Sequence, residues 1–104
     1  METRPWRMED VLATPELVAE YLNQVMEDGD REELVRAIGY VAKARGMSSF
    51  ARSCGMSRET LYASFARGGN PTLSTLTKAL RACGVRLRFE PMEERDSAQA
   101  QAIG

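Results

Sequence analysis

The sequence contains no histidine and only two cysteines. Without histidine it lacks the commonest general base and cannot form Ser-His or Cys-His nucleophile pairs. Cys54 and Cys83 form no CxxC pair and have no histidine with which to complete a metal site, so we expect buried free thiols. No phosphate-cradling glycine motif is present either. We therefore expect a protein that is not an enzyme and needs no cofactor, metal or small-molecule substrate.

Long apolar runs are also missing. Nothing in the chain approaches the roughly 18 consecutive apolar residues that cross a bilayer. The first residues are charged on both sides of Trp6 and lack the apolar core of a signal peptide. We therefore expect a cytoplasmic protein with no membrane partner. Its 104 residues, 43% hydrophobic and 28% charged, fit one globular domain.

The charge is distributed unevenly along the chain. Residues 1–42 carry four Arg and ten acids, a balance of −6, and residues 89–104 carry one Arg and four acids, a balance of −3. Residues 43–88 carry nine Lys or Arg and only Glu59, a balance of +8. A basic block in a folded region favours double-stranded DNA as a partner, because Lys and Arg release counterions from phosphates. The alternative is a set of scattered, solvated charges.

Helix start and stop signals predict five helices, beginning after hydroxyl or carboxylate caps and ending at glycines or Gly-rich turns. The predicted caps are Thr14, Asp30, Ser48 or Ser49, Ser57 and Thr72. Residues 1–13 show no clear helical period and are expected to form an N-terminal arm. Residues 14–91 are expected to form the domain, and residues 92–104 a flexible acidic tail.

Residues 85–89 alternate apolar and basic side chains, which is the period of a half-buried strand. The chain offers no second strand to pair with it. We therefore expect it to pair with the same strand of a second subunit, with Val85, Leu87 and Phe89 at the interface of a homodimer. The alternative is an extended tail that lies on its own domain.

Residues 50–65 have the pattern of a helix-turn-helix. Ala51 supplies the small side chain where two helices cross, and Gly55 supplies the positive φ that ends the first helix. Met56 fills the turn and Ser57 caps the second helix. The alternative is a generic helical bundle.

The start of the second helix in such a motif enters the major groove. Arg58 can donate two hydrogen bonds to guanine, and Glu59 can accept one from a cytosine amino group. The four side chains expected to reach base edges are Ser57, Arg58, Glu59 and Tyr62. Phosphate contacts are expected from Ser48, Ser49, Arg52, Arg67, Gly69, Asn70 and Thr72. The alternative for the glycine-rich loop among them is a simple chain reversal.

Between about Leu12 and Pro91, several segments of the sequence resemble those of a known protein family. The clearest are residues 21–23, 27–30, 42–47, 55–62, 69–71 and 80–84, with Leu87. In these segments the chain resembles the addiction-module antidote family, the HigA-like antitoxins of bacterial toxin-antitoxin systems, within the lambda-repressor-like helix-turn-helix class. The chain departs from the pattern at Met47 and Ser48, where a glutamine often stands, and at Ser64, which replaces an aliphatic residue.

The resemblance implies an antitoxin that neutralises a small RelE/HigB-like ribonuclease toxin and represses its own operon as a dimer. We therefore expect an all-α, five-helix lambda-repressor-like domain with a short C-terminal strand paired across a dimer. The acidic N-terminal half is the expected surface for a basic toxin. Its candidate residues are Trp6, Glu16, Glu20 and Glu27. The alternatives are a solvated helix face, a stand-alone repressor without a toxin, and a helical adaptor that does not bind DNA.

Overall fold

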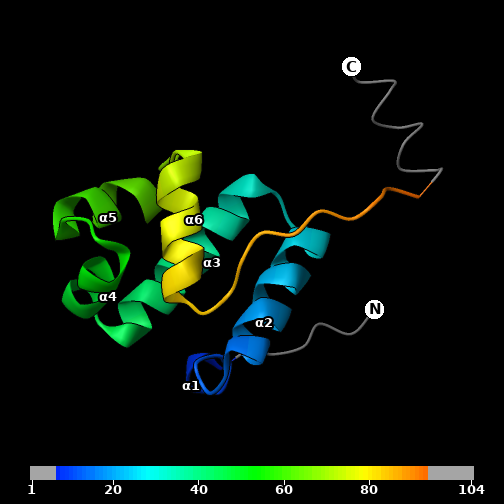
Figure 1. Cartoon of the computed structure of the whole chain (residues 1–104), viewed down its shortest axis with the longest axis horizontal. Helices are drawn as coiled ribbons and strands as arrows, with labels where there is room; N and C mark the ends of the chain where they lie inside the picture. Colours follow the sequence, from blue (N-terminus) through cyan, green and yellow to red (C-terminus); the bar gives the residue numbers. More distant parts are fainter. Residues whose placement is uncertain (1–6, 94–104) are drawn as a thin grey trace.

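The computed structural model describes residues 7–93, and within this range the chain is all-helical. Its elements are α1 (Met8–Val11), α2 (Pro15–Asp28), α3 (Arg31–Arg45), α4 (Met47–Cys54), α5 (Arg58–Phe65) and α6 (Leu73–Ala82). Figure 1 shows α4 and α5 at one end of the molecule and α1 with α2 at the other, with α3 and α6 between them. The central helix α3 packs against α1, α2, α4 and α5. None of the helices in residues 7–93 combines the length and apolar character of a membrane span.

Short-range signals in the sequence position the helix ends. At four N-termini the cap side chain accepts a hydrogen bond, 3.0–3.1 Å long, from the backbone N–H three residues later. These caps are Thr14, Asp30, Ser57 and Thr72. They confirm the predicted starts of α2, α3, α5 and α6.

At the first helix, the structure differs from what we expected from the sequence. Residues 8–11, expected to belong to an arm, form α1, and its Val11 is fully buried. Four residues are about one helical turn, too short for apolar residues to repeat at helical spacing, so the pattern could not reveal this helix. Trp6 of the same expected arm lies outside the described residues.

The core is built from apolar side chains of all six helices and contains no buried polar or charged residue among those described. Along α6, burial rises from the start of the helix to its end. Leu73 is 69% exposed, Leu76 is partly buried and Leu80 is only 6% exposed. Leu73, the first residue of the helix, therefore lies outside the core.

The segment after α6 does not form the predicted strand. Gly84 has a φ of +84°, and the N–H of Val85 donates to the carbonyl of Leu80 at 3.0 Å. The chain then runs on without strand pairing up to Glu93 (Figure 1). Val85 packs against the core, but Leu87 and Phe89 are exposed. A strand needs a neighbouring strand for its ladder, and the described part of a single chain supplies none. Most of the expected tail, residues 94–104, lies outside the described residues.

Candidate nucleic-acid interface

The turn between α4 and α5 follows the local pattern predicted from the sequence. Gly55 is left-handed, with a φ of +68°, and Ala51 is only 4% exposed. The N–H of Gly55 donates to the carbonyl of Arg52 at 3.1 Å, and that of Met56 to the carbonyl of Ala51 at 3.0 Å. These bonds satisfy carbonyls at the end of α4 and fix the direction in which α5 starts.

The exposed face of α5 carries the four side chains predicted to reach bases. Leu61 and Phe65 are buried, which anchors the helix by its inner face. Ser57, Arg58, Glu59 and Tyr62 are all exposed to solvent at the cap and in the first part of the helix. Because Ser57 is the cap residue, its hydroxyl is already bonded to the N–H of Thr60.

Arg58 connects the start of α5 to the start of α4. Its Nη1 lies 3.5 Å from the Oγ of Ser48, which is a long hydrogen bond. Its guanidinium carbon lies 5.5 Å from the centre of the Tyr62 ring, within the range of a cation–π contact. Two predicted base-contacting residues and one predicted phosphate-contacting residue therefore converge. The other predicted contacts on α4, Ser49 and Arg52, are exposed.

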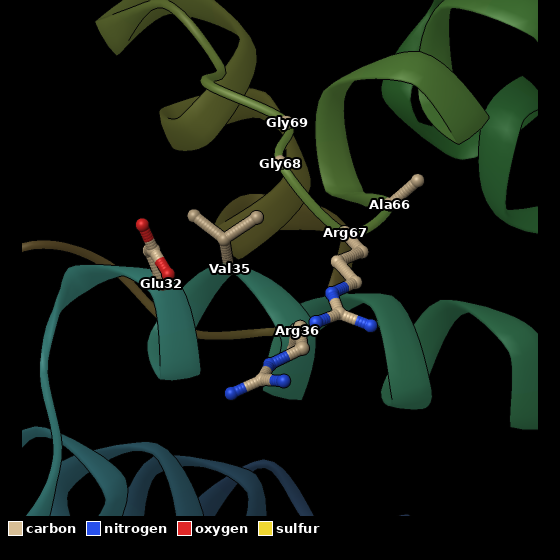
Figure 2. Close-up of a pocket in the computed structure, with 7 residues that line it drawn as sticks. All are labelled: Glu32, Val35, Arg36, Ala66, Arg67, Gly68 and Gly69. Carbon is tan, nitrogen blue, oxygen red and sulfur yellow. The ribbon is translucent and has the colours of Figure 1, made fainter.

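The loop from Ala66 to Thr72 contains the remaining predicted phosphate contacts, and three of them already form hydrogen bonds within the protein. The N–H of Gly69 donates to the carbonyl of Ala66 at 2.8 Å, and the Oδ1 of Asn70 accepts from Arg31 at 3.3 Å. Thr72 caps α6. Arg67, in contrast, is exposed and lines a pocket against α3 (Figure 2).

Three arginines on α3 make contacts that sequence reasoning missed. Arg31 donates to Asn70, Arg36 lines the same pocket as Arg67, and Arg45 donates to the carbonyl of Ala82 at 2.8 Å. Arg45 lies in the last turn of α3, but its guanidinium donates its hydrogen bond to the last residue of α6. No local pattern could have revealed these pairings, because each joins α3 to a segment far along the chain.

The predicted toxin-binding residues that the structure describes lie on α2. Glu16, Glu20 and Glu27 are exposed there. The α2 helix packs against α3, which in turn packs against α4 and α5 (Figure 1). The acidic candidate surface and the basic one are therefore carried by different helices.

The two thiols are buried and free, as predicted. Burial raises the pKa of Cys83 to about 11, with the nearby Arg45 lowering it and Cys54 raising it; burial also raises the pKa of Cys54. Both thiols are therefore neutral near pH 7, unlike a reactive cysteine. Within residues 7–93, no three Cys, Asp or Glu side chains gather in a way that could hold a metal ion.

These features define a small all-helical protein with an exposed, arginine-bearing face on α4 and α5. A family model described as "Probable addiction module antidote protein" matches residues 2–91, and the chain belongs to this family. It is 37% identical, over 84 residues, to an uncharacterised protein of Haemophilus influenzae, covering 81% of this chain and 84% of that protein. No solved structure matches the chain significantly. Membership of an antidote family implies a toxin partner and supports the prediction of a non-enzymatic protein.

Proposed function

We propose that this protein is a HigA-like antitoxin that acts in the cytoplasm, where it neutralises a RelE/HigB-like ribonuclease and represses its own operon. The family match supports the antidote role, and the likeness described above supplies the class of toxin. The observation that carries the DNA-binding part is the α4–α5 unit. Its tight turn at Gly55 places Arg58, Ser48 and Tyr62 together on an exposed face.

In this proposal the α4–α5 unit is a lambda-repressor-like helix-turn-helix, and the first turn of α5 enters the major groove. Arg58 then donates to the acceptor edge of a guanine, and Glu59 accepts from a cytosine amino group. Ser48, Ser49 and Arg52 at α4 contact the flanking phosphates. The contacts of Arg58 with Ser48 and Tyr62 favour this role, because they restrict the guanidinium before DNA arrives and so reduce the entropy lost on binding.

The repressor is proposed to act as a homodimer that contacts two half-sites one helical turn apart. The segment after α6 supports this arrangement. Leu87 is 44% exposed and Phe89 is 92% exposed, so the single chain leaves this apolar face uncovered. Pairing of residues 85–89 with the same segment of a second copy would cover both side chains and supply the missing strand neighbour.

The toxin is proposed to bind the acidic N-terminal half, where Glu16, Glu20 and Glu27 are exposed on α2. Residues 1–42 carry a net charge of −6, which complements a basic ribonuclease. Because α2 and α5 are different helices on either side of α3, a toxin on α2 leaves the proposed DNA face open (Figure 1).

Two measurements test this function. The full chain is first co-expressed with the product of the neighbouring gene and purified through a tag on that product. The complex and the free chain are then tested for a mobility shift of the DNA upstream of the operon, beside an unrelated duplex of equal length. We expect co-purification, and a shift of the upstream DNA at lower protein concentration than the unrelated duplex.

Other outcomes assign the protein to a different class. A specific DNA shift without co-purification indicates a stand-alone repressor. Co-purification with no binding to any duplex indicates an antitoxin or adaptor that does not bind DNA. Binding of both duplexes alike would contradict a role for α5 in reading sequence.

A further inference from the structure

One pocket of the described chain, of about 270 Å³, lies between α3 and the loop that follows α5. Arg36 comes from α3, and Arg67 is the second residue after α5. The other lining residues are Glu32, Val35, Ala66, Gly68 and Gly69. In Figure 2 both guanidinium groups lie on the same side of Val35, and the Glu32 carboxylate lies on the other.

The pocket has an excess of one positive charge, because two arginines and only one acid, Glu32, line it. Arg36 and Arg67 form no ion pair with an acid in residues 7–93, although both line the same small space. Two positive charges that line one pocket repel each other, and an anion bound in the pocket offsets that repulsion. Guanidinium groups are also the side chains best suited to donate paired hydrogen bonds to a phosphate. The pocket therefore fits a phosphate group.

We infer that Arg36 and Arg67 together bind one phosphate of the DNA backbone, an inference that rests on the proposed function. Arg67 is the second residue after α5, so a duplex that accepts α5 in its groove brings its flanking phosphates to this loop. The same loop leads to Thr72 and the N-terminus of α6, whose first-turn amides favour negative charge. Arg36 lies outside the basic block of residues 43–88 and extends the DNA contact onto α3.

The test measures the affinity of the full chain for the operator duplex over a series of salt concentrations by fluorescence anisotropy. The variants are Arg36→Gln, Arg67→Gln and the double variant. Arg7→Gln is the matched control, because Arg7 is an exposed arginine whose guanidinium pairs with Glu9 on α1. The slope of log affinity against log salt is negative, and loss of one phosphate contact should make it shallower by about 1. This change corresponds to about tenfold weaker binding at 0.1 M salt.

Because both arginines are assigned to one phosphate, the double variant should lose less than the sum of the two single losses. Arg7→Gln should leave slope and affinity unchanged. The inference would be overturned if Arg36→Gln kept the salt dependence of the wild type. It would also be overturned if the affinity lost in the double variant equalled the sum of the losses in the two single variants. Loss of toxin binding in Arg36→Gln with unchanged DNA binding would also overturn it, because the pocket would then accept an acidic protein segment.

A second measurement separates the pocket from the proposed function. Inorganic phosphate is titrated into the isotope-labelled chain while the backbone amide signals of Gly68 and Gly69 are followed by NMR. We expect these signals to shift in the wild type and in Arg7→Gln, and to stay fixed in the double variant. Phosphate-dependent shifts without binding to any duplex would contradict the DNA-binding function but leave the phosphate site standing. Duplex binding without any shift of these signals would contradict the site.

Discussion

Gly39 of α3 and Phe65 of α5 pack so closely that a Cβ atom on Gly39 would lie 2.8 Å from the Phe65 carbonyl oxygen. Real Cβ atoms essentially never come this close to a neighbouring atom, and the atom here is rigid backbone rather than a flexible side chain. The absence of a side chain at Gly39 therefore sets the distance between α3 and the C-terminal end of α5, the helix proposed to enter DNA.

Gly39→Ala tests this relationship. The exchange normally stabilises a helix by about 1 kcal/mol. Here the overlap with Phe65 should reverse the sign, and we expect a net loss of about 1–3 kcal/mol of the free energy of unfolding in urea. Ala44→Gly, at an exposed position of the same helix, is the control and should cost about 0.5–1 kcal/mol through helix propensity alone. A stabilised Gly39→Ala variant would show that the two helices can separate without cost.

Most helix boundaries could be predicted from the sequence because their causes lie within a few residues. The caps at Asp30 and Ser57 bond to amides three residues later, and Gly55 ends α4 through its own backbone conformation. The same short-range pattern predicted which side chains of α5 point outward. Arg58 and Tyr62 are exposed, whereas Leu61, next to Tyr62, is buried.

The remaining features depend on contacts between distant segments. The spacing of apolar residues did not reveal the one-turn helix containing Val11, whose burial depends on α3 packing against it. The pocket of Arg36 and Arg67 likewise exists only once α3 and the loop after α5 have come together. The expected strand at residues 85–89 is absent from the described single chain because a strand requires a partner. Whether a second copy supplies one depends on association, which sequence periodicity cannot decide.

The buried thiol of Cys83 should make stability depend on alkaline pH. Burial raises its pKa from 9.0 to about 11, so the folded state favours the neutral thiol. This contribution is fully present below pH 9 and is lost as the pH rises toward 11, with a total on the order of 2 kcal/mol. Under reducing conditions, the free energy of unfolding of the wild type should fall more steeply between pH 9 and 11 than that of Cys83→Ala. Parallel curves for the two proteins would contradict the assignment.

The dimer proposal is tested by placing a charge on the apolar side of the segment after α6. Leu87→Asp and Phe89→Asp should dissociate the dimer, because each would bury an unpaired carboxylate at the interface. Both positions are exposed in the single chain, so the monomer should remain folded. We expect sedimentation velocity to show a monomer at concentrations where the wild type is dimeric.

The matched control is Arg88→Asp, which introduces the same carboxylate on the alternate side of the segment and should leave the dimer intact. A dimer that survives both apolar substitutions would place the interface elsewhere.

The central claim, that α5 reads DNA sequence through Arg58, is tested most directly by measuring the affinity of Arg58→Ala for the operator and for single-base variants of it. The wild type should discriminate against a changed guanine at one position, and Arg58→Ala should lose about 1–3 kcal/mol of that discrimination while keeping it elsewhere. Arg52→Ala, which removes an exposed arginine of α4, should weaken binding to every duplex alike. If Arg58→Ala also weakens all duplexes equally, Arg58 does not contact a base and the account is wrong.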